Sequence, residues 1–312
     1  MKIIRYPQYQ SMLSDSCVTI GNFDGVHIGH QVLIKKVVEE AGIRQCQSVV
    51  VTMHPLPQQY FAGKSSVELL TSFKSKARLI ASMGVDVLCV LNFNQLLSQM
   101  SAKEFFDKLL IGGLGAQYIL VGDDFKFGKN RQGDFAKLQK WSHQLGLTAE
   151  NINSIQKNDT RVSSTCIRAL LKSGDFIQAS KMLGRTFGLI GRVAHGRKQG
   201  RKLGYPTINI ELKQGGFPLH GVYVTHILVG GIVYQSVTSV GMNPTVGGNA
   251  KRVEVHVLDF DQDVYGQTVE VLFYKKLRNE VEFDSLNELV SAIEQDIADG
   301  LNFFASYKGE LV

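Results

Sequence analysis

The chain has 312 residues, 44% of them hydrophobic and 20% charged, and carries a formal net charge of +6 at pH 7. Its length favours two domains with sizeable cores, and its charge suits anionic ligands but is too small and dispersed to indicate a nucleic-acid-binding protein. With no signal-like N-terminus, no apolar run of membrane-spanning length and no C-x-x-C pair among four cysteines, we expect a reduced cytoplasmic protein that avoids membranes.

The first distinctive stretch is V-T-I-G-N-F-D-G-V-H-I-G-H at residues 18–30. A β-branched run begins it, apolar residues at helical spacing follow from residue 28, and the turn between them consists of Gly21, Asn22, Phe23, Asp24 and Gly25. A helix N-terminus has unpaired N–H groups and a positive dipole end, and His27 and His30 would share one face of its first turn. The stretch predicts a phosphate-binding strand–turn–helix unit. A metal site of Asp24, His27 and His30 is the alternative, although no fourth ligand has a suitable spacing.

Strand-like and helical stretches alternate through the rest of the first half. Strands are predicted at residues 47–52, 86–91, 118–121 and 147–152, and helices at residues 74–83, 101–111 and 134–145. Ser101 and Glu104 have the spacing of a capping box at the start of the second helix. The alternation predicts an α/β domain with a Rossmann-like parallel sheet covered by helices, which binds ligands outside the carboxyl ends of its strands.

A polar segment, G-D-D-F-K-F-G, follows the predicted strand 118–121. Asp123 could simply end the strand and cap a turn. Asp124, which has Phe125 and Phe127 beside it, could instead hydrogen-bond to a ribose or a flavin. The segment therefore leaves a structural and a ligand-binding interpretation open for its acidic pair.

A third polar cluster, R-V-S-S-T-C-I-R at residues 161–168, precedes an apolar helical stretch. An N-cap role explains one of its hydroxyl residues, which are Ser163, Ser164 and Thr165. Arg161 and Arg168 flank these hydroxyls at the start of a helix. Together they predict a clamp for the β- and γ-phosphates of a nucleotide.

The three motifs G-x-F-D-G-x-H-x-G-H, V-G-D-D-F-x-F-G and S-S-T-x-I-R, in this order, resemble the adenylyltransferase half of bacterial bifunctional riboflavin kinase/FAD synthetases. The resemblance implies that His27 and His30 stabilise the phosphates of ATP, that Asn22 shapes the pocket, and that Asp124 lies in the flavin/ATP site. It implies that the triphosphate is held by Arg161, Ser164, Thr165 and Arg168. The chain departs from similar proteins at His54, Leu56 and Ser75, where acidic or polar residues are common.

The pattern changes after residues 183–187, which we interpret as the boundary between domains 1–183 and 184–312. Short strands are predicted at residues 187–193, 222–228, 232–239, 253–258 and 268–273, with glycines and polar turns between them. An amphipathic helix is predicted at residues 285–297. These elements predict a small antiparallel β-barrel followed by a C-terminal helix.

The loop G-R-K-L-G-Y-P-T-I-N at residues 200–209 carries polar side chains in an extended segment. Pro206 alone indicates only a turn. Thr207 and Asn209, however, point the same way and offer hard oxygen ligands for Mg²⁺ bound with nucleotide phosphates. Nearby glycines at 196, 200 and 204 would let backbone N–H groups approach those phosphates. In the stretch V-E-V-H-V-L-D-F, Glu254 and His256 lie on the same face of the predicted strand. A glutamate in a strand is usually a solvated residue on the outer face.

This half resembles riboflavin kinase through G-R-V-x-H-G, G-R-x-L-G-Y-P-T-x-N, G-V-Y, E-V-H-x-L-D-F and L-R-N-E. The resemblance implies that Thr207 and Asn209 bind Mg²⁺ with ATP or ADP and that Glu254 is the general base. It places Arg278 and Glu280 beside the flavin, and adds as nucleotide- or flavin-binding positions Gly191, His195, Gly196, Gly204 and Pro206. Asn243 stands where close relatives carry Arg before the Pro-Thr pair.

Two consecutive reactions are therefore expected of a monomer or weak homo-oligomer. The C-terminal half would phosphorylate riboflavin with ATP to give FMN and ADP, and the N-terminal half would join AMP from ATP to FMN, giving FAD and pyrophosphate. One alternative is a nucleotidyltransferase for another phosphorylated substrate with an accessory barrel. A flavin- or RNA-binding module is a second alternative, against which the lack of a basic, aromatic-rich stripe counts.

Overall fold

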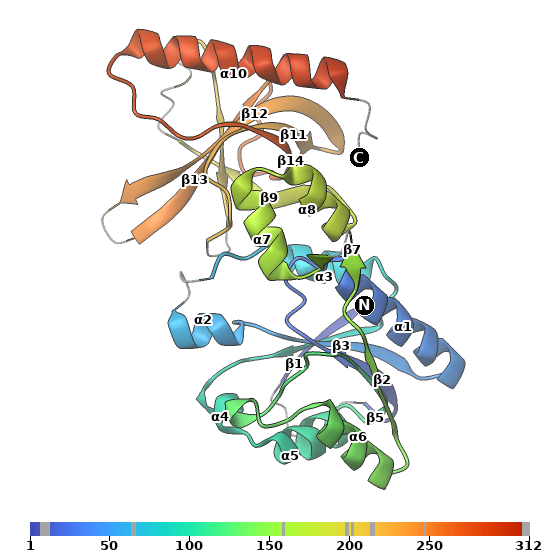
Figure 1. The fold of residues 1–312 in the computed structure, drawn as a ribbon. Helices are drawn as coiled ribbons and strands as arrows, with labels where there is room; N and C mark the ends of the chain where they lie inside the picture. Colours follow the sequence, from blue (N-terminus) through green and yellow to red (C-terminus); the bar gives the residue numbers. More distant parts are fainter. Residues whose placement is uncertain are drawn as a thin grey trace. The chain divides into compact units, whose positions relative to one another are not determined.

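The structure is a computed structural model that describes residues 1–6, 13–63, 67–157, 160–196, 200, 203–212, 216–245 and 248–307, without the side chains of 243–245 and 248–250. The chain forms two compact units (Figure 1). The first, the sheet unit, comprises Met1–Val67 and Phe73–Ser164, and the second, the barrel unit, comprises Glu68–Ser72 and Thr165–Val312. Helix α8 (Phe176–Leu183) ends at residue 183, where the sequence predicts the domain boundary, and it belongs to the barrel unit. That the two functions divide at residue 183 stays a prediction.

In the described part of the sheet unit, the main sheet has six strands, all paired in parallel, in the order β1-β4-β3-β2-β5-β6. The strands are β1 Lys2–Tyr6, β2 Ser16–Ile20, β3 Gln47–Met53, β4 Val87–Leu91, β5 Ala116–Gly122 and β6 Thr148–Ile152. The helices are α1 Ile28–Arg44, α2 Pro57–Ala62, α3 Phe73–Ala81, α4 Gln95–Gln99, α5 Ala102–Glu104, η1 Phe105–Ile111, η2 Lys129–Arg131 and α6 Phe135–Gln144. A short ribbon, β7 Gln156–Lys157 and β8 Thr160–Arg161, completes the unit. The predicted parallel α/β fold is confirmed.

The sheet is buried on both faces because alternate residues of its central strands enter different cores. Val49 and Val51 pack with the apolar residues of η1 and α6, whereas Val50, between them, packs with Ile34 of α1 and Ile80 of α3. The strands therefore carry almost continuous apolar runs, as expected of a parallel sheet covered by helices.

The helix predicted over residues 101–111 begins as α5 and continues as the π-helix η1. Its predicted capping box is confirmed, because the Ser101 hydroxyl accepts from the backbone N–H of Glu104 and the Glu104 carboxylate accepts from the N–H of Ser101, each at 3.1 Å. The wider turns end where the N–H of Gly112 donates to the carbonyl of Asp107 at 2.8 Å.

The barrel unit is a closed antiparallel barrel in the order β10-β13-β12-β11-β14-β9, which confirms the predicted architecture. Its strands are β9 Phe187–Ala194, β10 Ile208–Glu211, β11 Gly221–Val229, β12 Ile232–Thr245, β13 Gly248–Val257 and β14 Thr268–Arg278. Helix α7 (Ser164–Ser173) begins at Ser164, the last residue assigned to the sheet unit, and continues in the barrel unit. Helix α10 (Leu286–Ser306) extends nine residues past the predicted end of the C-terminal helix.

Helix α10 is fastened to the barrel at two places. The His226 ring on β11 stacks on Phe304, with centroids 4.4 Å apart. Arg278 at the end of β14 forms a bidentate pair with the buried Asp296 through bonds of 2.9 and 2.8 Å. These contacts hold the helix along the barrel (Figure 1).

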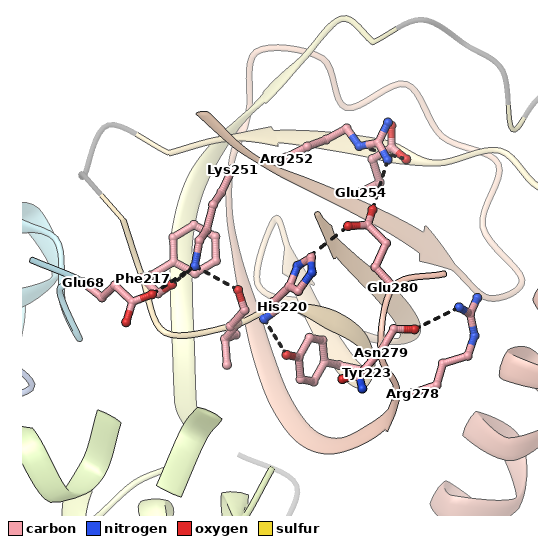
Figure 2. Close-up of polar contacts among 11 residues, drawn as sticks. Glu68, Phe217, His220, Tyr223, Lys251, Arg252, Glu254, Arg278, Asn279 and Glu280 are labelled. Atoms are coloured by element: carbon pink, nitrogen blue, oxygen red, sulfur yellow. Dashed lines mark hydrogen bonds and ion pairs between the residues drawn. The ribbon is translucent and has the colours of Figure 1, made fainter. Parts of the chain in front are cut away.

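A short segment from the first half of the sequence, Glu68–Ser72, belongs to the barrel unit. The N–H of Leu69 donates to the carbonyl of Gly216 at 2.7 Å. The Glu68 carboxylate lies 2.6 Å from Lys172 of α7. It also lies 3.4 Å from Lys251 of β13 (Figure 2). Partial burial acts to raise the pKa of Glu68, but the two lysines outweigh it and hold the pKa below its usual range.

We expect Asp296→Ala to destabilise the barrel unit by about 3 kcal/mol, because it leaves the Arg278 guanidinium half-buried and uncompensated. Faster hydrogen exchange in α10 and β14 under mild urea would measure this loss. Asp299→Ala, on the same helix, removes an acceptor of a hydrogen bond from Gln295; it is the control and should change stability by less than ~0.5 kcal/mol. Equal exchange in the two variants would contradict the anchoring role of Asp296.

Candidate active sites

The first candidate site is built where β2 ends and α1 begins. His27 is the N-cap of α1, and its Nδ1 accepts from the backbone N–H of His30 at 3.3 Å. The two rings stack with centroids 3.5 Å apart and an interplanar angle of 16°. A Cβ at Gly29 would lie 3.2 Å from the His27 ring, which explains why glycine stands between the histidines. The structure thus brings both predicted histidines to the N-terminus of a helix, where backbone N–H groups are unpaired.

The electrostatics of this pair favour a neutral His30. Burial lowers the pKa of His30 well below its usual value, and the neighbouring His27 and Lys76 lower it further. Its Nδ1 is buried and receives no hydrogen bond from any residue that the structure describes. A buried polar atom without a partner is unusual in folded proteins, which makes His30 a candidate for contact with a ligand.

The turn that leads to His27 is held in a rare backbone conformation. Phe23 and Val26 have φ of 48° and 41°, a region that is disfavoured for bulky and β-branched residues. Both side chains are buried, and the N–H of Val26 donates to the carbonyl of Phe23 at 3.3 Å. Such conformations persist only where surrounding contacts enforce them, and they concentrate at functional sites.

Two side chains outside the motif hydrogen-bond to this turn at the carbonyl of Asn22. The Thr52 hydroxyl at the end of β3 donates to that oxygen at 3.1 Å, and Lys76 Nζ of α3 donates to it at 2.6 Å. Lys76 is buried, and the sequence analysis missed it because a single lysine in an amphipathic helix looks like a surface residue.

The acidic pair that follows β5 has two different environments. Asp123 accepts from the N–H and hydroxyl of Ser154, at 2.9 and 2.7 Å, and Arg161 lies 3.3 Å from it. Partial burial acts to raise the pKa of Asp123, but these partners outweigh it and keep the pKa low. Asp124 is more exposed and lies 2.7 Å from Arg161. Asp123 therefore fastens the loop, while Asp124 and Arg161 present polar groups at the sheet edge.

The residues of the predicted triphosphate clamp are distributed over both compact units. The Ser164 hydroxyl donates to the carbonyl of Asp24 at 2.9 Å, so it fixes the motif turn within the sheet unit. Arg168, in the barrel unit, donates from Nε to the carbonyl of Glu68 at 2.6 Å. Ser163 is half-buried at the start of α7, and Thr165 is exposed. The clamp as a whole stays a prediction.

An aromatic cluster that the sequence analysis missed lies at the same edge of the sheet. Tyr60 and Phe61 on α2 and Phe93 after β4 have ring centroids 5.2–5.8 Å apart. Tyr60 is 40% exposed and Phe61 71% exposed. Exposed rings beside polar groups can stack on a flat aromatic ligand. Leu56, one of the noted departures, is buried at the start of α2.

The second candidate site is a cavity of about 630 Å³ in the barrel unit. It is lined by seven predicted residues: His195, Gly196, Thr207, Asn209, Glu254, Arg278 and Glu280. Its other wall includes Leu289, Ile293 and Ile297 of α10, so the predicted apolar face of that helix lines the cavity. Apolar walls with a few convergent polar groups are typical of small-molecule sites.

Three predicted residues do not line the described cavity and instead shape the backbone around it. A Cβ at Gly191 would lie 2.3 Å from the Ile210 side chain, and Gly204 has φ of 88°. The carbonyl of Pro206 lies 2.8 Å from Nδ1 of His256. Gly196, by contrast, must lack a side chain because a Cβ there would lie 2.1 Å from the Asn209 amide.

Strand pairing places Glu254 directly opposite Asn209 across β13 and β10. Opposite residues on one face of an antiparallel pair have Cβ atoms about 5 Å apart, so a carboxylate, an amide and the nearby Thr207 hydroxyl converge. All three are hard oxygen donors of the kind that Mg²⁺ prefers. Among the described residues no cluster of three Asp, Glu, His or Cys side chains could hold a metal, which disfavours the alternative centre of Asp24, His27 and His30.

Arg252, which could have been predicted from the sequence but was not, lies near both carboxylates of the cavity (Figure 2). Its guanidinium lies 3.8 Å from Glu254 and 3.7 Å from Glu280. Glu280 also lies 3.7 Å from His220, and it approaches Gly241 so closely that a Cβ there would lie 2.1 Å away. Period-two alternation along β13 was the available signal, because it puts residue 252 on the same face as 254.

Comparisons with known proteins match the two parts of the chain to two family models. A family model described as FAD synthetase matches residues 9–166, and one described as riboflavin kinase matches residues 183–304. A Pseudomonas fluorescens protein named bifunctional riboflavin kinase/FMN adenylyltransferase is 43% identical, with 90% of this chain and 91% of that protein covered. The Haemophilus influenzae protein of the same name is 37% identical, with 98% of this chain and 100% of that protein covered.

A solved structure from Streptococcus pneumoniae, described as a macrolide-efflux protein, has a TM-score of 0.84 and 30% identity to this chain. The match covers 97% of this chain and 99% of that one. In the part of this chain that the structure describes, every helix is too short or too polar to cross a membrane. Because both family models match in order and the curated relatives match over nearly their whole length, the chain belongs to the family of bifunctional riboflavin kinase/FMN adenylyltransferases.

Proposed function

We propose that this chain makes FAD from riboflavin in two steps, each of which consumes ATP. The barrel unit transfers the γ-phosphoryl group of ATP to the 5′-hydroxyl of riboflavin, giving FMN and ADP. The sheet unit then transfers AMP from a second ATP to the phosphate of FMN, giving FAD and pyrophosphate. The observation that carries this proposal is the contrast between the sites, since one offers a carboxylate and the other a stacked histidine pair at a helix N-terminus.

The barrel site suits phosphoryl transfer to an alcohol. A ribityl hydroxyl is a poor nucleophile at neutral pH, and a positioned general base accelerates such a reaction by ~10²–10⁴-fold. Glu254 takes the hydroxyl proton as the oxygen bonds to the γ-phosphorus and the bond to the β,γ-bridging oxygen breaks. The apolar α10 wall, with Ile293 and Ile297, suits the flavin ring, and Arg278 is held beside it by Asp296.

Thr207 and Asn209 are the residues that would hold Mg²⁺ together with the nucleotide. Their hydroxyl and amide oxygens supply only part of a coordination shell, so phosphate oxygens and water complete it. When bound, the ion neutralises charge on the phosphates. The close approach of the Asn209 amide to Gly196 keeps that ligand in place.

The sheet site suits adenylyl transfer, which needs no general base because the phosphate of FMN is already an anion. The FMN phosphate oxygen bonds to the α-phosphorus as the bond to the α,β-bridging oxygen breaks. His27, His30 and the N–H groups that begin α1 face the phosphates and stabilise the charge that develops. The exposed rings of Tyr60 and Phe61 offer a stacking surface for the flavin. A cytoplasmic location and a monomeric or weakly associated state remain part of this proposal.

Incubation of the full chain with riboflavin, ATP and Mg²⁺, followed by chromatography, tests the function directly. We expect FMN to appear first and FAD to follow. Consumption of ATP without either flavin product would point to another phosphate acceptor.

Glu254→Gln should lower FMN formation by at least ~10²-fold, because the amide cannot accept the hydroxyl proton. Conversion of supplied FMN to FAD should stay at the parent rate, which shows that the sheet unit is intact, and circular dichroism checks that the barrel unit folds. A parallel loss of both activities would contradict the division of labour between the two sites.

His27, His30 and the N–H groups that begin α1 together form what we call the phosphate seat. His30→Ala should lower FAD formation from supplied FMN by at least ~10-fold, because it removes one donor from this seat. Steady-state rates of both reactions, measured on one preparation, check this expectation. FMN formation should be unchanged. A variant that forms FAD as fast as the parent would exclude a phosphate-binding role for His30.

A further inference from the structure

Lys76 is a buried cation that the mechanism above does not use. It lies on α3, where only 5% of its surface is exposed, and its neighbours Ala77 and Ile80 pack into the core beneath the sheet. An isolated buried ammonium is strongly disfavoured, so a protein keeps one where it has specific partners or a function.

The partners of Lys76 all belong to the turn and strand ends that form the phosphate seat. Its Nζ donates to the carbonyl of Asn22 at 2.6 Å and lies 3.5 Å from the Thr52 hydroxyl, which donates to the same carbonyl. One backbone oxygen thus receives donors from α3 and from β3. This oxygen belongs to the strained turn that delivers His27 to the start of α1.

The charge of Lys76 faces two titratable groups. Asp24 in the turn attracts the ammonium of Lys76. The same ammonium disfavours protonation of His30 on α1, whose ring stacks on His27. A positive charge behind two imidazoles strengthens the attraction of the seat for an anion, because the surroundings are poorly solvated.

We propose that Lys76 is a positioning residue of the adenylyl-transfer site, which fixes the Asn22 carbonyl and supplies a buried positive charge behind the His27–His30 phosphate seat. This inference rests on the proposed adenylyl transfer, and it assigns to Lys76 a role that neither the H-x-G-H motif nor the predicted triphosphate clamp contains.

The protonation state of Lys76 makes the role measurable. Burial lowers the pKa of Lys76 to about 8, although the charge of Asp24 acts in the opposite direction. In the free enzyme the ammonium therefore loses its proton as the pH rises through about 8. Because kcat/KM reports groups of the free enzyme, kcat/KM for ATP in FAD formation should fall above that pH.

Two substitutions separate charge from packing. Lys76→Met keeps much of the side-chain volume but removes the ammonium, and we expect it to lower FAD formation by at least ~10-fold at pH 7. Lys76→Arg stays charged at every accessible pH, so the fall in kcat/KM near pH 8 should disappear even if the altered geometry lowers the rate overall. Lys74→Met removes the same charge from an exposed position on the same helix and should change neither the rate nor the pH profile.

The assay uses the full chain and measures FMN-to-FAD and riboflavin-to-FMN conversion on one preparation, so the second reaction reports folding of the barrel unit. Circular dichroism reports whether the variants fold. If Lys76→Met does not fold, the pH profile of Lys76→Arg alone tests the inference. The inference is overturned if folded Lys76→Met forms FAD within about twofold of the parent, if the parent shows no fall near pH 8, or if Lys76→Arg keeps that fall. Absence of FAD formation by the parent would instead refute the proposed function.

Discussion

Burial of the parallel sheet on both faces is the constraint on which the sheet unit depends. Residues such as Val50 and Val51 enter opposite cores, so the body of each central strand has no position open to a polar ligand. Polar chemistry is therefore confined to the segments that follow the strands. The motif turn after β2, Thr52 at the end of β3, Phe93 after β4 and Asp124 after β5 meet at this edge because the strands run in parallel.

Periodicity and turn residues were sufficient to predict most of this unit. The β-branched runs and glycine-rich turns marked β2, β3 and β5. The edge strand β1 was missed because Lys2–Tyr6 is short and its two charged residues, Lys2 and Arg5, lie three positions apart and give no period-two pattern. Lys76 was missed for a different reason. A pattern assigns a lysine to the surface, and only the fold shows that a backbone carbonyl and an acidic side chain surround it.

In the barrel, the sequence predicted which residues share a face but not which residues meet. Thr207 and Asn209 point the same way in any extended segment, whereas the opposition of Asn209 and Glu254 depends on the register of β10 against β13. Arg252 was visible as a neighbour of Glu254 on its strand, but its proximity to Glu280 depends on closure of the barrel. Register and closure arise from contacts distant in sequence, which single-strand patterns do not contain.

The segment Glu68–Ser72 gives the barrel unit a discontinuous sequence, because five residues that precede α3 complete a body otherwise formed after residue 164. Its side-chain and backbone partners include Lys172, Lys251 and Gly216. A hybrid gene that joined the first half of one relative to the second half of another would therefore take residues 68–72 from one protein and the rest of the barrel unit from the other. An exchange of the two halves would therefore keep these contacts only if residues 68–72 were exchanged together with the barrel.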